Sequence, residues 1–246
     1  MSVTSISLFK FSGILDKTWA FRQMLEARWR LATTPEIQFY KLLGSGTRDG
    51  FYPYPNFGVY GLLAVWPSLE SAQKGTCLTP AFRRFRSHAF EHWTVFMSAT
   101  QSRGKWSGRS PFNVKKGNND LNSTSGLTAV LTRATIKAIH VPSFWKQVPA
   151  ISHSIVNQRG MLFKIGLGEV PWLHQATFTI WCDSEALDKF AFRGPHGTAI
   201  ANVRAGDWFK EELFVRFQVL GTDGDWPDAC KVTKLTNKHS PAIDYQ

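Results

Sequence analysis

An internal repeat restricts the fold of this chain more than any other feature of its sequence. Five residues of the first half return in the same order and without a gap, 115 positions later, so that Trp66, Glu70, Lys74, Pro80 and Trp93 are matched by Trp181, Glu185, Lys189, Pro195 and Trp208. Two of the matches join tryptophans, a rare residue type, so chance is a poor explanation. The chain therefore contains one supersecondary unit built twice.

A glycine-rich segment supports the repeat and shows where the copies differ. Residues 42–46 parallel residues 164–168 at an offset of 122 positions. The difference from the main offset (122 − 115 = 7) places seven additional residues in the first copy, in the loop 47–57, which contains the aromatic run 51–57. This loop is either a lid over a long apolar ligand or a cover for one end of the fold.

Hydrophobic periodicity predicts strand, helix, strand, strand, helix, strand in each copy. In the first copy the first helix covers 16–31, and the strands fall at 6–9, 36–43, 59–66 and 93–98. The second copy is predicted to contain a helix that Pro149 breaks, with its elements at 127–139, 143–154 and 212–220. This order is that of the ferredoxin-like unit.

Local signals at the second helix of each copy agree with this order. Ser68 and Asp183 are predicted N-caps, each followed two residues later by a glutamate that suits the positive end of a helix. Pro80 and Pro195 are each predicted to break that helix and to start another.

Two ferredoxin-like units predict an α+β barrel, because each sheet has one face covered by helices and one bare face, and two bare faces can pack together. We expect the first repeat at 1–98, a connecting segment at 99–126 and the second repeat at 127–221. A polar tail at 222–246 is expected to fray.

Composition limits the function classes. The chain carries 29 Lys and Arg against 18 Asp and Glu, a formal net charge of +11, and 14% of its residues are aromatic. This combination is the footprint of a nucleic-acid binder, although aromatic surface also suits a flat apolar ligand. A basic band in mid-sequence is either a solvated surface or a docking surface for an acidic protein or an anionic membrane, and consists of Arg83, Arg84, Arg86, Lys105, Arg109, Lys115 and Lys116.

Cysteine usage and hydropathy predict a reduced, cytoplasmic location. Cys77, Cys182 and Cys230 form no C-x-x-C pair and cannot all be bridged. No signal peptide and no run of about 18 apolar residues is present, so any membrane is expected to be met from outside.

Longer strings resemble a known family. In the second half they cover 131–136, 144–151, 163–171, 174–181, 194–196 and 208–213, and in the first half 106–108 and 111–112. These strings resemble the spheroidene monooxygenase family of carotenoid biosynthesis. The resemblance implies an oxygenase that introduces a keto group at the allylic end carbon (C-2 type) of acyclic carotenoids such as spheroidene. It also implies haem as cofactor and reduced ferredoxin as electron donor.

His196 is the candidate haem ligand. The second copy also resembles dimeric α+β-barrel monooxygenases, in which a histidine on the second helix of the unit can ligate iron. The equivalent position of the first copy (196 − 115 = 81) holds Ala81, as one cofactor per chain requires. Apolar walls are expected from Phe190, Trp181 and Trp208. The alternative is a histidine that bonds the backbone in the turn after Pro195.

Other polar residues complete the candidate site. His174 is either the ligand itself, a group that handles protons on bound dioxygen, or a histidine at the edge of a strand. Glu169 either orients a histidine or is a solvated turn residue. Arg204 is a candidate for a haem propionate, with a solvated charge as the alternative, and Arg133 and Lys164 are notable charges in apolar strands.

Three rival functions remain open. The first is a module that binds haem or a lipid without turnover, and the second is a nucleic-acid binder. The third is a zinc hydrolase, because residues 88–92 match the H-x-x-E-H pattern of one class of zinc peptidase. Against it, Trp93 is predicted to begin a strand, so His92 falls beyond the end of the helix. No phosphate-binding loop or nucleophile elbow is present, and the sequence leaves the oligomeric state open.

Overall fold

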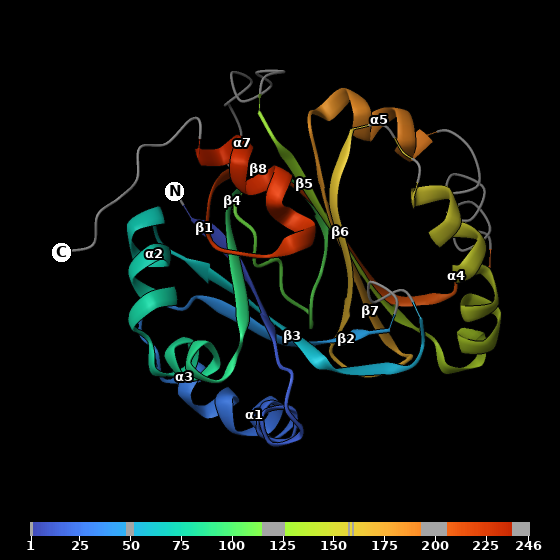
Figure 1. The fold of residues 1–246 in the computed structure, drawn as a ribbon. Coiled ribbons are helices and arrows are strands. Elements are labelled where there is room, and N and C mark those ends of the chain that lie inside the picture. The colour runs from blue at the N-terminus through green and yellow to red at the C-terminus, as the bar shows by residue number, and fades with distance from the viewer. Residues whose placement is uncertain are drawn as a thin grey trace. The chain divides into compact units, whose positions relative to one another are not determined.

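The computed structural model describes residues 2–47, 52–114, 126–156, 158, 160–192 and 206–237 (Figure 1). The first half contains β1 (Val3–Lys10), α1 (Ile14–Ala32), β2 (Phe39–Gly46), β3 (Pro55–Trp66), α2 (Leu69–Leu78), α3 (Pro80–His88) and β4 (Glu91–Gly104). The second half contains β5 (Thr128–Ile136), α4 (Val141–Val156), β6 (Met161–Gly168), β7 (His174–Trp181), α5 (Ser184–Phe192), β8 (Phe209–Gly224) and α7 (Cys230–Asn237). Short 3-10 turns precede α4 and α7, at Ala138–His140 and Pro227–Ala229.

The sheet order confirms the predicted α+β barrel of two ferredoxin-like repeats. The strands are hydrogen-bonded in the closed order β1-β3-β2-β6-β7-β5-β8-β4. Within it, β4-β1-β3-β2 and β8-β5-β7-β6 have the same internal order, which is expected of two copies of one unit. The glycine-rich segments join the copies, since Gly44 and Ser45 of β2 pair with Gly168 and Leu167 of β6.

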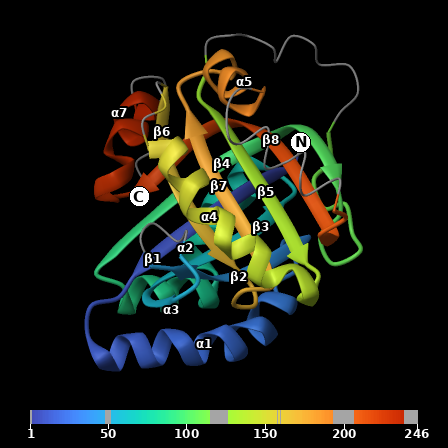
Figure 2. The ribbon, with the colours of Figure 1, turned by 90° about the vertical axis from the view of Figure 1, so that its right-hand side faces the viewer.

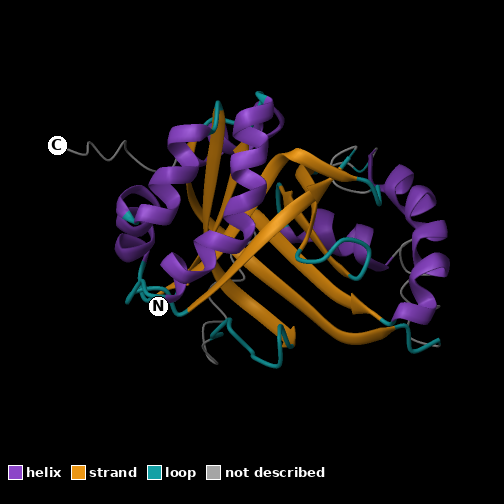
Figure 3. Cartoon of the chain, turned by 90° about the horizontal axis from the view of Figure 1, so that it is seen from below, coloured by secondary structure: helices purple, strands orange, loops and turns teal. Residues whose placement is uncertain are grey.

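The chain forms two compact units. Unit 1 consists of residues 1–43, 57–99 and 218–246, and unit 2 of residues 44–56 and 100–217. In each unit the helices lie outside the strands, as Figure 3 shows. Figure 2 shows α4 across the outer side of β5, β6 and β7 in unit 2.

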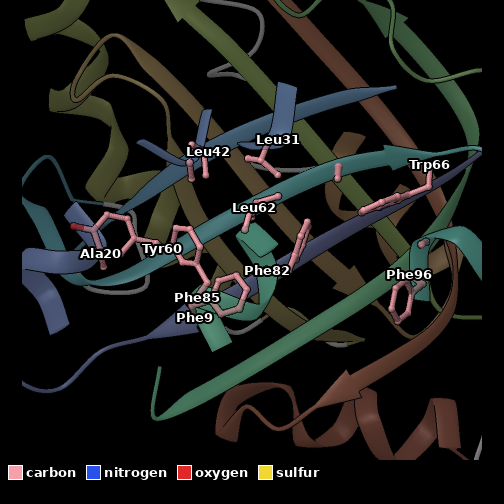
Figure 4. Packing of buried hydrophobic residues seen from close by; sticks show 14 of the residues in the cluster. Phe9, Ala20, Leu31, Leu42, Tyr60, Leu62, Trp66, Phe82, Phe85 and Phe96 are labelled. Atoms are coloured by element: carbon pink, nitrogen blue, oxygen red, sulfur yellow. The ribbon is translucent and has the colours of Figure 1, made fainter. Parts of the chain in front are cut away.

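The core of unit 1 is rich in aromatic side chains (Figure 4). Phe9 and Phe85 pack with ring centroids 5.1 Å apart, and Trp66 lies 5.8 Å from Phe82. The helices that bring these rings onto the sheet begin as predicted. The Ser68 side chain accepts the Ser71 N–H at 3.1 Å, and Pro80 is the first residue of α3.

Trp66 and Trp181, one of the two repeated tryptophan pairs, end β3 and β7. Both are buried, but their indole N–H groups have different hydrogen-bond partners. Trp66 Nε1 donates to Ser5 Oγ at 2.8 Å, across to β1. The register of β5 on β7 puts Val130 at the position that corresponds to Ser5, and valine offers no acceptor. Trp181 Nε1 instead donates to Thr179 Oγ1 at 2.9 Å. A buried indole N–H needs a hydrogen-bond acceptor, and the two copies supply it from different strands.

Gly75 of α2 lies directly beneath Trp66. A Cβ atom at Gly75 would fall 2.2 Å from Trp66 Cζ3, too close for two carbon atoms. We therefore expect Gly75→Ala to lower the free energy of unfolding by about 2 kcal/mol, although the same change in an open helix raises it by up to about 1 kcal/mol. Urea unfolding measures the difference, and the exposed neighbour variant Lys74→Ala should stay within about 0.5 kcal/mol of wild type. A Gly75→Ala midpoint at or above that of wild type would contradict this packing.

Three sequence expectations differ from the structure. The predicted break at Pro149 is wrong, because α4 runs from Val141 to Val156. Proline removes one backbone donor, but a helix can nevertheless continue past it. The connection was predicted to begin at residue 99, but β4 continues to Gly104. The tail does not fray directly after residue 221, because β8 continues to Gly224 and the buried Val232 anchors α7.

Candidate active site

A buried arginine organises a polar cluster in unit 2, which we call the Arg133 cluster: Trp106, Arg133, Glu169, His174 and Glu211. Arg133 lies on β5, His174 begins the neighbouring β7, and Glu211 lies on β8, the other neighbour of β5. Glu169 follows the last residue of β6, and Trp106 follows β4. The closed sheet order therefore brings together residues that lie up to 105 positions apart, as do Trp106 and Glu211.

Arg133 is held between two carboxylates. Its side chain is 3% exposed, its Nη1 donates to Glu211 Oε1, and its Nη2 lies 3.3 Å from Glu169 Oε2. The guanidinium carbon lies 5.7 Å from the centre of the Trp106 ring, within the range of a cation–π contact. Since a buried charge is costly unless it is paired, these contacts explain how a cation is accommodated in an apolar strand.

Glu211 is further fixed by a tight turn. Residues 106–109 form a two-residue hairpin turn in which Ser107 (φ 53°) and Gly108 (φ 73°) both have left-handed backbone. Their backbone N–H groups donate to Glu211 at 2.9 Å and 2.7 Å. Burial by itself raises the pKa of Glu211, but these two N–H groups and the Arg133 guanidinium outweigh it, so the pKa lies below its ordinary value.

Glu169 links the arginine to the histidine. Its Oε2 accepts the Trp106 indole N–H at 2.7 Å and lies 3.7 Å from His174 Nδ1. The turn that places these two residues depends on Gly168, because a Cβ atom there would lie 2.5 Å from the His174 carbonyl oxygen. The His174 N–H closes the turn on Val170 O at 3.0 Å.

The Glu169–His174 pair can hold and move a proton. The Glu169 carboxylate lies 3.7 Å from His174 Nδ1, on one side of the imidazole ring. His174 is half-buried, with a side chain 29% exposed, so its ring is partly accessible to a ligand. Both roles predicted for His174, as a group that handles protons and as a haem ligand, stay predictions, as does the role of Glu169 in orienting a histidine.

The remaining predicted site residues are placed as follows. His196 and Arg204 lie outside the described residues. Phe190 lies in α5, where the backbone alone is described. Trp181 is buried in a core cluster with Val130 and Leu187. Its predicted place in the wall of a cofactor site stays a prediction. Trp208 is half-buried just before β8 and stacks on His140, with ring centroids 5.6 Å apart.

The aromatic loop of the first copy is partly strand. Tyr52 and Tyr54 belong to the loop, whereas Phe57 lies within β3. Trp172, in the turn after Glu169, donates its indole N–H to Pro53 O at 2.9 Å. The loop is thus tied to the segment that carries Glu169, and its role as a lid stays a prediction.

The zinc-peptidase pattern is divided between two elements. His88 is the last residue of α3, and Glu91 and His92 belong to β4, as predicted from the position of Trp93. His88 stacks on Trp19, with ring centroids 3.9 Å apart, and contacts Asp16 at 3.2 Å. Within the described part of the chain, no three His, Cys, Asp or Glu side chains gather closely enough to hold a metal ion.

The predicted basic band is divided between the units. Arg83, Arg84 and Arg86 lie on α3 in unit 1, whereas Lys105 and Arg109 belong to unit 2. Arg86 is bound to Asp223, so it is not an unpaired surface charge. Lys115 and Lys116 lie outside the described residues.

Sequence reasoning singled out Arg133, Glu169 and His174 but missed two members of the Arg133 cluster. Glu211 and Trp106 stand inside strings that carry the family resemblance, yet neither is unusual in its local pattern. Two signals were available in the sequence. Ser107-Gly108 is a dipeptide that suits a tight turn. Arg133, as a cation in an apolar strand, required a carboxylate partner.

The fold defines the class of the protein. A solved aldoxime dehydratase in complex with butyraldoxime superimposes with a TM-score of 0.57 at 12% identity, over 89% of this chain and 79% of that one. A second aldoxime dehydratase structure gives a TM-score of 0.54. The chain is an α+β barrel of the type that these enzymes share.

Sequence comparison defines the family within that class. No protein-family model matches. Spheroidene monooxygenase of Cereibacter sphaeroides is 42% identical over 228 residues, which cover 92% of this chain and 69% of that protein. The spheroidene monooxygenase of Rhodobacter capsulatus is 40% identical over 92% of this chain and 93% of its own length, and that of Rubrivivax gelatinosus is 30% identical over 85% and 79%. The chain belongs to the spheroidene monooxygenase family.

Proposed function

We propose that this chain is a monooxygenase that introduces a keto group at the allylic end carbon (C-2 type) of an acyclic carotenoid such as spheroidene. The observation that carries the proposal is the 42% and 40% identity to two proteins named spheroidene monooxygenase, each along 92% of the chain. We place the activity in the cytoplasm. Among the described residues, no helix is long and apolar enough to cross a membrane.

The proposed cofactor is haem, which His196 would hold through its imidazole. Haem supplies the activation of dioxygen when it is bound, and reduced ferredoxin is the proposed electron donor. Phe190, Trp181 and Trp208 are the proposed walls of the site, and Arg204 the proposed partner of a propionate. The protein's contribution is to bind the polyene, to orient its end carbon and to exclude water.

The Arg133 cluster supports this function by supplying protons. Each hydroxylation inserts one oxygen atom of dioxygen into a C–H bond, and the other leaves as water with two electrons from the donor and two protons. His174, oriented by Glu169 with Oε2 3.7 Å from its Nδ1, is the proposed group that delivers these protons. A second hydroxylation at the same carbon gives a geminal diol, which loses water to form the ketone.

Turnover by the purified full-length protein tests the proposal. The protein is supplied with haem, reduced ferredoxin and detergent-dispersed spheroidene, and the product is analysed by mass spectrometry. We expect a product with one more oxygen and two fewer hydrogens than the substrate, with the hydroxylated carotenoid as an intermediate. Haem binding without dioxygen consumption or product would instead favour a binding module. Tight, salt-sensitive binding of single-stranded RNA would instead indicate a nucleic-acid-binding protein.

A further inference from the structure

Helix α1 exposes a continuous apolar surface. Ile14, Leu15, Phe21, Leu25 and Trp29 are between 58% and 85% exposed. The opposite side of the helix is fixed to unit 1 by the buried residues Ala20, Gln23, Ala27 and Leu31. Isolated apolar residues are common on protein surfaces, but five large ones on one 19-residue helix form a patch that marks an interaction site.

These side chains form one stripe. At about 100° per residue, Ile14, Phe21, Leu25 and Trp29 project within about 80° of one another around the helix axis, and Leu15 lies at one edge of this stripe. The stripe extends about 22 Å along the axis from Ile14 to Trp29. Leu25 and Trp29 also border a shallow hollow of about 410 Å³ together with Glu26 and Arg30, so their surfaces are open. Figure 2 shows α1 along the outside of unit 1, with its length open to the surroundings.

Basic residues flank the stripe on both sides. Arg22 and Arg28 lie about 60° to either side of Leu25, and Lys17 lies beyond Arg28. Both acidic residues of the helix are bound to neighbouring side chains. Asp16 contacts His88 at 3.2 Å, and Glu26, which borders the hollow beside Leu25 and Trp29, accepts hydrogen bonds from Arg22 and Gln23. The exposed face therefore presents apolar and cationic groups, with the paired carboxylate of Glu26 at its edge.

This arrangement matches the surface of an anionic bilayer. A helix that lies in the membrane plane has an apolar stripe that enters the acyl boundary, with Trp and Phe near the headgroups. Arginines on both sides can bury their stems and direct their guanidinium groups to lipid phosphates. An acidic protein partner would match the arginines but would leave the central apolar stripe without a counterpart.

We propose that α1 is a membrane-docking helix that lies on anionic lipid with the stripe from Ile14 to Trp29 inserted. The proposal goes beyond the proposed function, because it rests on the exposed residues of α1 alone. It also gives the enzyme access to a substrate that dissolves in the bilayer.

Vesicle flotation with the full-length protein tests the docking. Wild type should bind vesicles of phosphatidylglycerol and phosphatidylcholine and should bind pure phosphatidylcholine much more weakly, with an affinity that falls as salt rises. The variant Leu25→Gln/Trp29→Gln should bind the anionic vesicles at least about tenfold more weakly, since two apolar side chains leave the acyl boundary. Arg22→Gln/Arg28→Gln should lower the affinity and remove most of its salt dependence.

Matched controls come from exposed residues of unit 1 outside α1. Leu78→Gln/Arg83→Gln makes the same kinds of change on α2 and α3 and should leave vesicle binding unchanged. Equal binding by wild type and the α1 variants, or by anionic and neutral vesicles, would overturn the proposal. So would an apparent mass that falls from dimer to monomer in the α1 variants, because the stripe would then contact a second copy.

The test is separate from that of the enzymatic activity. All four proteins should show the same thermal midpoint and the same turnover of detergent-dispersed carotenoid, because α1 is outside the Arg133 cluster. Loss of vesicle binding with turnover intact supports docking by α1. If wild type binds vesicles but none of the four proteins turns over carotenoid, the proposed function is refuted and the docking proposal stands.

Discussion

Replacing Arg133 with methionine is expected to lower the free energy of unfolding by about 3 kcal/mol. Methionine retains much of the apolar stem but leaves Glu169 and Glu211 without the cation that both contact. Removal of one partner from a buried ion pair typically costs about 3–5 kcal/mol, and the partial exposure of the two carboxylates points to the lower end. Urea unfolding at pH 7 gives the difference.

The deficit should depend on pH. In wild type the pKa of Glu211 lies below its ordinary value of 4.5, so its ionisation stabilises the fold above about that pH. This stabilisation is lost as the pH falls through the lower, folded-state pKa. In Arg133→Met the Glu211 carboxylate loses a cation that lowers its pKa, so it takes up a proton more readily. The difference between wild type and variant should therefore be largest near pH 7 and should shrink below about pH 4.5.

Two further variants separate charge pairing from packing. Arg216→Met removes a more exposed pair, with Asp188, and should cost less than about 1 kcal/mol. The triple variant Arg133→Met/Glu169→Gln/Glu211→Gln should recover part of the lost stability, since no unpaired charge stays buried. A deficit that is the same at pH 4 and pH 7, with no recovery in the triple variant, would show that Arg133 acts through packing alone.

The second large effect concerns His174 and His196, the two candidate histidines of the proposed haem site. His196→Ala is expected to abolish the Soret band of the haem-reconstituted protein, because the residue proposed to hold the haem is lost. His174→Ala is expected to retain the band and to lower turnover about 100-fold, in the range for the loss of a positioned proton donor. Absorption spectra and carotenoid turnover of the two variants, measured side by side, distinguish the ligand from the proton donor.

A third histidine provides the control. His88→Ala removes an imidazole that stacks on Trp19 in unit 1, and it should leave both the spectrum and the turnover unchanged. A spectrum lost in His174→Ala and retained in His196→Ala would reverse the two roles. Glu169→Gln tests the link to the cluster: turnover and its pH dependence should change, whereas the Soret band should persist.

The fold could be predicted from the sequence because its strongest signal is nonlocal and needs no homologue. The pairing of Trp66 with Trp181 fixes the ends of β3 and β7, and Ser68 and Asp183 cap the helices that follow. A local rule failed at Pro149, since α4 continues through this proline to Val156.

The candidate site was only partly predictable, for a physical reason. Arg133 is visible in the sequence because a cation in an apolar strand must be compensated. Its partners are not visible, because Glu211 reaches it from β8 and Glu169 from the turn after β6. No spacing along the chain records these contacts, which exist only once the barrel order places β8 and β7 on either side of β5.

The packing of the first copy explains why only one of the two repeats can carry a histidine at this place. Ala81, the counterpart of His196, is buried in the same aromatic core as Phe82 and Phe85. An imidazole in place of the Ala81 methyl group would overfill this core. The repeat thus constrains the small residue of the first copy by packing, and a histidine at this position is compatible with the second copy alone.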